Sequence, residues 1–280
     1  MANLDDNCVD LLDRATWPAD VVTCLKRHKM LFVAKERKDQ KYAREHRQLD
    51  RKSPAEQMAW RMKQYSARYD LQAYEDALAE VVAVLGHYAL LGYHCTRLTE
   101  CEISQILSHG MQLTSGSMLE SRIHAIRSCG MIGSTLADKL AGDHQAEAKN
   151  RKGMIWFCFF SPHAATEQGI GSLMRYWGGE ALFQTWRHDS SIDAVLKNIG
   201  TACLVEANVP VVSLSPHGWL GVHVARQFLI HDGFKTSEPA LHEDWSHDPI
   251  PAANIHRIIR YPEPDFIRLT RCDEWELDLN

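Results

Sequence analysis

The sequence changes character near residue 92, and this change restricts the possible folds more than any other feature. Before it, apolar residues recur at the spacing of an α-helix. After it, short apolar runs alternate with short segments that carry helix-capping residues. Because this order of elements is typical of segregated helices and strands, we predict an α+β protein. We expect two domains, a helical N-terminal region over residues 1–91 and a second domain over residues 92–280.

The helical region contains a well-marked helix start. Ser53, Pro54 and Glu56 match the N-cap, N1 and N3 positions of a capping box. Apolar and aromatic residues continue at helical spacing from there to residue 91, and no Gly or Pro interrupts them before Gly86. The pattern predicts either one long helix or two abutting helices.

The second domain is predicted to form one mixed β-sheet with flanking helices. Thr99 and Glu102 form another capping box, and Gly110 is placed to end that helix. Residues 153–162 are almost wholly apolar or aromatic, which predicts a central strand buried on both faces. Further helices are expected over residues 118–129, 134–149 and 189–200. Further strands are expected over residues 111–115, 201–210, 222–233 and 254–262 and from Glu180 onward.

Composition points to a soluble, cytoplasmic protein without a membrane partner. No run approaches the roughly 20 apolar residues of a membrane helix. The acidic N-terminus lacks the basic-then-apolar order of a secretory signal. The eight cysteines include no C-x-x-C pair, so we expect mostly buried free thiols.

The net charge of −5 conceals a basic segment. Residues 26–63 contain thirteen Lys and Arg against five Asp and Glu, a balance of +8, which leaves −13 for the remainder. Such an arm suits contact with nucleic acid, but a solvated helix face with mixed charges is the alternative. The residues expected to contact nucleic-acid phosphates are Lys35, Arg37, Lys38 and Lys41. Phe32 and Tyr42 lie between or beside them and are candidates for stacking on bases.

Three motifs of the second domain carry groups suited to chemistry. His94, Thr96 and Arg97 end a predicted strand, either as polar groups at its rim or as donors aimed at a ligand. The aromatic strand at residues 156–160 offers rings for core packing or for stacking on a planar ligand. Two glycines precede Glu180, a carboxylate at the start of a predicted apolar strand. Glu206, on the following predicted strand, is the competing carboxylate.

The order of these motifs resembles that of ADP-ribosyltransferases. A strand-borne His-x-Thr, an aromatic strand and a later Glu follow one another in both. "YHCTRLTECEISQILSHGMQLTS" resembles the opening of bacterial members that modify DNA or RNA, and "WFCFFSP" is similar to their aromatic strand. The resemblance covers residues 93–261 and leaves the first 90 residues outside. It implies an ADP-ribosyltransferase-like sheet and NAD as a substrate.

The resemblance also implies a role for each site residue. His94 and Thr96 would hold the ribose or the nicotinamide amide of NAD, Arg97 would pair with the pyrophosphate, and Arg122 is a second arginine candidate. One of two aromatic residues, Phe159 or Phe160, would stack on the nicotinamide, where the family commonly has Tyr.

Glu180 would be the catalytic residue under this resemblance. It would bind the ribose 2′-hydroxyl and stabilise the positive charge that develops as nicotinamide leaves, or act as the base for the nucleophile. Members that modify arginine usually carry a second Glu two residues earlier, and here that position is Gly178. The resemblance therefore favours RNA or DNA as acceptor, and a toxin or anti-phage effector that a neutralising protein could oppose.

Two alternatives remain open at the level of sequence. An NAD glycohydrolase would use water as acceptor, and a catalytically inactive fold would serve as a nucleic-acid or protein-binding module. The chain has no G-x-G-x-x-G, Walker or G-x-S-x-G motif, which disfavours Rossmann oxidoreductases, P-loop ATPases and α/β hydrolases. Residues 242–248 cluster His and carboxylates without regular ligand spacing, so we expect no metal there.

Overall fold

The computed structural model describes residues 7–49, 52–66, 71–215 and 219–279 and divides the chain into two compact units. The sheet unit comprises Met1–Cys8, Ala89–Ser215 and Glu243–Asn280. The helical unit comprises Val9–Tyr88 and Pro216–His242. The predicted boundary at residue 91 lies close to Ala89, but the prediction placed Pro216–His242 in the wrong domain.

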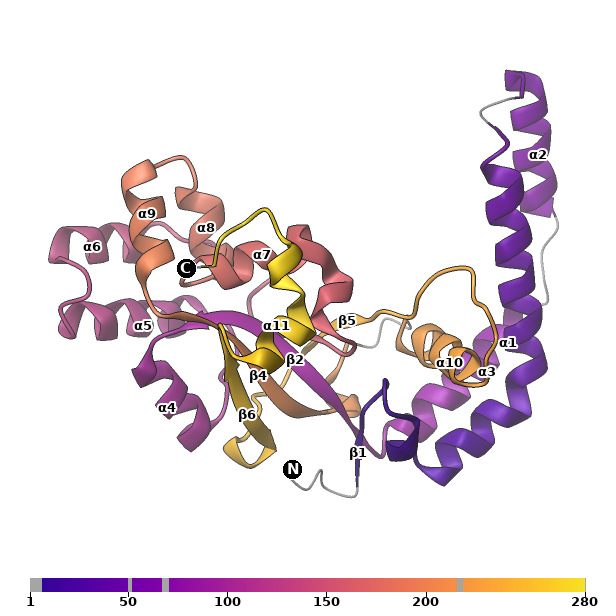
Figure 1. The fold of residues 1–280 in the computed structure, drawn as a ribbon, viewed down its shortest axis with the longest axis horizontal. Helices are drawn as coiled ribbons and strands as arrows, with labels where there is room; N and C mark the ends of the chain where they lie inside the picture. The colour runs from indigo at the N-terminus through magenta and orange to yellow at the C-terminus, as the bar shows by residue number, and fades with distance from the viewer. Residues whose placement is uncertain (1–6, 50–51, 67–70, 216–218, 280) are drawn as a thin grey trace. The chain divides into compact units, whose positions relative to one another are not determined.

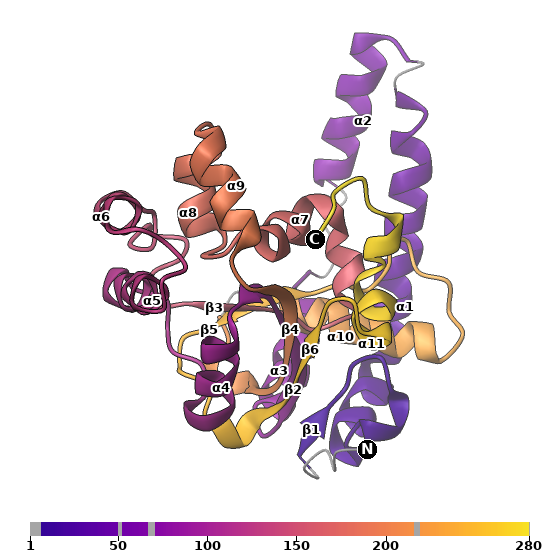
Figure 2. The ribbon, with the colours of Figure 1, turned by 60° about the vertical axis from the view of Figure 1, so that its left-hand side comes forward.

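In its described residues, the helical unit contains four α-helices, which Figure 1 labels. They are α1 (Ala19–His46), α2 (Pro54–Ser66), α3 (Leu71–Leu85) and α10 (Trp219–His231), preceded by a short 3-10 helix, η1 (Arg14–Thr16). The capping box at Ser53 and Glu56 is present and α2 follows it, and the predicted choice between one long helix and two abutting helices falls on residues 67–70, outside the described residues. In the views of Figures 1 and 2, α1 and α2 lie side by side.

Helix α10 replaces a strand predicted over residues 222–233. Val222, Val224 and Phe228 mimic the alternation of a half-buried strand, but Leu220, Val224 and Phe228 also recur every four residues. The helix packs against α1 and α3, so its apolar residues are buried at helical rather than strand spacing. This tertiary contact decided between two patterns that the sequence carried together.

The sheet unit contains one antiparallel sheet. Its strands are β1 (Cys8–Val9), β2 (Ala89–Leu98), β3 (Ile155–Cys158), β4 (Thr201–Pro210), β5 (Glu243–Ser246) and β6 (Ile255–Arg260). The order is β5-β3-β2-β4-β6, with β1 also paired to β2. The α+β class is confirmed, whereas the predicted mixture of parallel and antiparallel pairs is wrong for β2 to β6. Strand β3 lies next to the edge strand, and its Trp156 is 39% exposed, so it is not buried on both faces.

Seven α-helices flank this sheet within the described residues. They are α4 (Glu100–His109), α5 (Gly116–Ser128), α6 (Ser134–Gly142), α7 (Thr166–Arg175), α8 (Glu180–Trp186), α9 (Ser190–Asn198) and α11 (Pro264–Thr270). Short 3-10 helices are η3 (Pro162–Ala165), η4 (Val211–Ser213), η5 (Ala252–Asn254) and η6 (Cys272–Glu274).

The predicted helices near α4, α5 and α9 are confirmed, but three other predictions need correction. Helix α6 ends at Gly142 instead of residue 149. The strand expected over residues 111–115 is reduced to one bridge between Met111 and Ile250. The strand expected from Glu180 is the helix α8.

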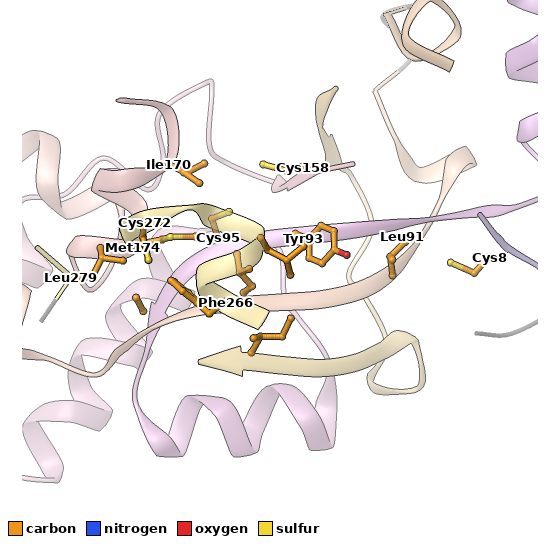
Figure 3. Close-up of a cluster of buried hydrophobic side chains, with 14 residues drawn as sticks. Cys8, Leu91, Tyr93, Cys95, Cys158, Ile170, Met174, Phe266, Cys272 and Leu279 are labelled. Atoms are coloured by element: carbon orange, nitrogen blue, oxygen red, sulfur yellow. The ribbon is translucent and has the colours of Figure 1, made fainter. Parts of the chain in front are cut away.

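Side chains alternate across β2 and so divide the sheet unit into two environments. Tyr93 and Cys95 lie in a buried cluster with Met174 of α7 and Phe266 of α11 (Figure 3). His94 and Thr96 point to the other face and line one cavity there, whereas a second cavity also reaches Tyr93 and Cys95 of the cluster. A second core of α5, α6, α8 and α9 side chains supports those cavities from outside the sheet. Six of the eight cysteines are buried and all eight are free, as predicted for most of them.

Within the described parts of the chain, none of the helices combines the length and apolar character needed to cross a membrane.

Candidate functional site

Two adjoining cavities in the sheet unit collect the candidate residues. The first, about 440 Å³, is lined by His94 and Thr96 of β2 and by Glu102 and Arg122 of the neighbouring helices. The second, about 390 Å³, is lined by His94 again and by Glu180. A further hollow of about 740 Å³ also touches Glu102 and Arg122. Volumes of this size are typical of small-molecule sites.

The two cavities share part of their walls. Residues that line both are His94, Cys95, Thr114, Leu173, Gly178 and Ala181. Strand β2 pairs with β4 along its whole length, but its register with β3 is the single pair Tyr93 and Cys158. Among the described strands, the residues of β2 beyond Tyr93 have no register partner on β3, and His94, Cys95 and Thr96 line the cavities.

His94 stands at the junction of the two cavities as a neutral imidazole. Its Nδ1 lies 2.8 Å from the backbone carbonyl oxygen of Trp156. Burial lowers the pKa of His94, and the nearby charge of Arg122 acts in the same direction. An Nδ1 that bonds to a carbonyl must carry the hydrogen, so the neutral ring has its lone pair on Nε2. His94 can therefore accept a hydrogen bond from a ligand hydroxyl or amide.

Arg122 is held beside the first cavity by Glu102. Its Nε donates to Glu102 Oε1 at 2.6 Å, and its guanidinium carbon lies 4.9 Å from the centre of the Trp177 ring. Nη2 of Arg122 is buried and has no hydrogen-bond partner in the part of the chain that the structure describes. Arg122 thus keeps an unused donor within the wall of the first cavity.

Glu102 does more than cap α4. It completes the predicted capping box with Thr99 and also accepts a hydrogen bond of 3.0 Å from Trp177 Nε1. Burial works to raise the pKa of Glu102, but the charge of Arg122 and the hydrogen bonds outweigh it and lower that pKa. The capping motif was visible in the sequence, whereas its ion pair with α5 had no sequence signal.

Glu180 reaches the second cavity from the first turn of α8. Its Oε2 lies 2.8 Å from Nη2 of Arg151, and its side chain is 43% exposed. Gly178 and Gly179 have φ angles of +81° and +56°, a region that favours glycine, and they turn the chain into α8. Glu180 is thus an ion-paired, solvent-accessible carboxylate on a helix, not a strand carboxylate as expected.

Arg97 does not belong to this site, contrary to expectation. Its side chain is buried, with the residue 5% exposed, and its Nε donates to the carbonyl oxygen of Ile199 at 2.9 Å. Its Nη1 donates to the carbonyl oxygens of Met174 and Leu279. The side chain alternates to the sheet face away from His94, where it ties together backbone segments instead of meeting a ligand.

The aromatic assignment also needs correction. Phe159 and Phe160 are 1% and 3% exposed and line neither cavity. Trp156 and Phe157 line the second cavity instead. The Trp156 ring lies 4.6 Å from that of Trp245 on β5, and the two rings are tilted by 47°.

Glu206, the competing carboxylate, lies on the other face of the sheet. It pairs in register with Tyr93, whereas its neighbour Val205 pairs with His94. Its carboxylate accepts from Arg257 at 3.2 Å, and this hydrogen bond is the main factor that raises the pKa of Arg257. Glu206 lines neither cavity.

The candidate nucleic-acid residues lie on α1, in the helical unit. Arg37 and Lys41 are exposed, whereas Lys35 forms an ion pair of 2.5 Å with Asp39. Burial lowers the pKa of Lys38, and Lys35 adds to this effect. Phe32 is 2% exposed and cannot stack on bases, while Tyr42 is 43% exposed and lies beside Trp60.

Comparison with protein-family models, with curated proteins and with solved structures gave no match to this chain.

Proposed function

We propose that this protein cleaves NAD and transfers its ADP-ribose to a macromolecule, with RNA or DNA as the favoured acceptor. One observation carries the proposal. His94 of β2 and Glu180 of α8 line the same cavity, and the adjoining cavity adds Thr96 and Arg122. A neutral acceptor, an anionic carboxylate and a cationic donor thus line two cavities that share part of their walls.

These groups match the parts of a dinucleotide. The guanidinium of Arg122 suits a phosphate oxygen, because a planar cationic donor recognises phosphate well. Nε2 of His94 suits a ribose hydroxyl or the carboxamide of nicotinamide, both of which donate. Trp156 offers a flat apolar surface for an aromatic ring at the second cavity.

Glu180 would act on the bond that breaks. As the bond between the ribose C1 and the nicotinamide nitrogen breaks, its electron pair leaves with nicotinamide and positive charge develops on the sugar. A carboxylate held nearby stabilises that charge. An oxygen or nitrogen of the acceptor then bonds to C1, and its proton passes to Glu180 or to solvent.

Two features separate this proposal from the pattern that the resemblance implied. The carboxylate comes from a helix instead of a strand, and Arg97 is replaced by Arg122 as the cationic ligand. The proposal therefore rests on which side chains share the cavities. The exposed basic side chains of Arg37 and Lys41 on α1 support a polyanionic acceptor, since phosphate contacts supply much of the affinity for nucleic acid.

Incubation with NAD labelled in its adenylate half tests the proposal. The full chain is mixed with cellular RNA, DNA and protein in separate reactions, and the fate of the label is followed. We expect label on RNA or DNA. Label on protein would show a transferase with a protein acceptor. Free ADP-ribose alone would show a glycohydrolase instead of a transferase. Unconsumed NAD would contradict the proposal.

A further inference from the structure

Three side chains of the helical unit converge in a way that the proposed function does not use. Cys24 and His28 lie on α1, and Glu80 lies on α3. One ligand atom from each, the Cys24 sulfur, a His28 ring nitrogen and a Glu80 oxygen, all lie within 4.8 Å of one another. Since Cys24 and His28 are four residues apart, they occupy one face of α1 on successive turns.

The contacts within this trio centre on the carboxylate. Nε2 of His28 lies 2.6 Å from Glu80 Oε2, and the Cys24 thiol also hydrogen-bonds to Glu80. Cys24 is 3% exposed, whereas the Glu80 side chain is 39% exposed. The cluster therefore has a buried sulfur at its base and opens to water at its carboxylate.

We propose that Cys24, His28 and Glu80 bind a divalent transition-metal ion, with Zn²⁺ as the best match, and water as the fourth ligand. Thiolate, imidazole and carboxylate together suit zinc and disfavour magnesium and calcium, which take oxygen ligands. Zinc bonds of about 2.0–2.3 Å place tetrahedral ligand atoms about 3.3–3.8 Å apart. The three ligand atoms now lie within 4.8 Å of one another, and movements of about 1 Å through side-chain rotation would bring them to that spacing.

Metal binding at this site requires only proton loss and ligand exchange, with no change of oxidation state. The Cys24 thiol gives its proton to solvent and its sulfur bonds to the metal as thiolate. His28 adopts the tautomer with its hydrogen on Nδ1, so that the Nε2 lone pair faces the metal. Glu80 exchanges its hydrogen bonds from these two groups for a bond to the ion.

The surrounding charges favour a cation. Asp20 lies one turn before Cys24 on α1, and its charge acts on the Cys24 thiol; the Tyr88 hydroxyl donates to it at 2.9 Å. Arg27 pairs with Glu80 and is the opposing positive charge. Two carboxylates and a thiolate against one guanidinium leave a balance of −2 for the ion to neutralise. The alternative is an ordinary helix–helix ion pair of Arg27, His28 and Glu80.

Cobalt separates these two alternatives, because a thiolate bound to Co²⁺ produces a charge-transfer absorption that an ion pair cannot. The full chain is stripped with a chelator and titrated with Co²⁺. We expect the band to saturate at one equivalent, to disappear on addition of Zn²⁺, and to be absent in Cys24→Ser. The matched control is Cys101→Ser, which removes an exposed cysteine of α4 and should keep the band.

A second variant keeps the test valid if the buried Cys24→Ser protein does not fold. His28 is only partly buried, so His28→Gln should fold, and we expect it to weaken Zn²⁺ binding roughly 10-fold or more in calorimetry. Arg27→Gln should strengthen binding, because it removes the competing cation. Absence of the cobalt band, its persistence in folded Cys24→Ser, or unchanged Zn²⁺ affinity in His28→Gln would overturn the site. Since NAD plays no part, these outcomes are independent of the proposed function.

Discussion

Nη2 of Arg151 lies 2.8 Å from Oε2 of Glu180, so the carboxylate assigned to NAD cleavage is held by a guanidinium at the second cavity. Arg151 comes from the turn before β3 and Glu180 from the start of α8. Nε of Arg151 is buried and has no hydrogen-bond partner among the described residues. The pair thus fixes the direction of the carboxylate while the Arg151 side chain retains a donor.

Arg151→Met should reduce NAD turnover far more than it reduces stability. Glu180 is 43% exposed, so loss of the ion pair should cost about 1 kcal/mol or less in the free energy of unfolding. A misplaced carboxylate should slow turnover roughly 10- to 100-fold. Urea unfolding and NAD consumption measure the two effects, with Arg151→Lys as a control that keeps the charge. Normal turnover in Arg151→Met would show that the pair does not position Glu180.

Glu102→Gln should destabilise the sheet unit strongly. The variant leaves the partly buried charge of Arg122 without its carboxylate, and removal of one partner from a buried pair costs about 3–5 kcal/mol. Urea unfolding of the variant and of the exposed control Glu120→Gln measures the difference. Equal stability of the two variants would contradict the role given to Glu102.

The same ion pair should make the protein sensitive to acid. Because the pKa of Glu102 is lowered from its ordinary value of 4.5, the unfolded chain binds the proton more readily than the folded chain. The stability that Glu102 contributes is complete above pH 4.5 and is lost as the pH falls from there through the lowered pKa. Glu102→Gln should remove this part of the pH dependence in unfolding curves recorded between pH 3 and pH 7.

Arg97→Met should affect stability and leave NAD binding intact. Three backbone carbonyls lose their donor, at about 1–3 kcal/mol for each buried group left unpaired. Arg122→Met should weaken NAD binding, and it should also cost stability because it leaves the buried carboxylate of Glu102 without its cation. Calorimetry with NAD on both folded variants distinguishes them. Loss of NAD affinity in Arg97→Met alone would restore the pyrophosphate role that the sequence suggested.

Charge reversal on α1 should weaken nucleic-acid binding. Lys35→Glu, Arg37→Glu and Lys38→Glu combined should reduce the slope of log K against log salt by about 2.1–2.7, at about 0.7–0.9 for each of three lost phosphate contacts. The control reverses three basic residues of the sheet unit, Arg127, Lys139 and Arg187. Unchanged affinity and salt dependence in the α1 variant would leave α1 as a solvated helix face.

The parts of the fold that the sequence predicted well are those with local signals. The capping box at Thr99 and Glu102 marks α4 correctly, and the apolar run of β4 ends at Pro210 as expected. Helix α8 was missed because the run Ala181, Leu182, Phe183 is too short to separate a helix turn from a strand. Its helical state follows from packing against α9 and the helices around it, which no local pattern contains.

The site was predicted only in part for a similar reason. The sequence identified His94, Thr96, Arg122 and Glu180, and the structure brings these four to the two adjoining cavities. The sequence could not separate Arg97 from these site residues, because Arg97 directly follows Thr96 in the chain. Only the alternation of side chains along β2 sends Thr96 and Arg97 to opposite faces of the sheet. Trp156 was overlooked in favour of Phe159 and Phe160, since an apolar run does not show which ring lines a cavity.

A comparison of two conservative variants tests the central proposal most directly. Glu180→Gln and Glu206→Gln each remove one negative charge, but only Glu180 lines the cavity with His94. We predict that Glu180→Gln lowers NAD consumption about 100-fold or more, as expected when charge stabilisation of a transition state is lost. Glu206→Gln should consume NAD at the rate of the unaltered protein when both variants are folded by circular dichroism. Full turnover in Glu180→Gln, with turnover lost in Glu206→Gln, would contradict the proposal.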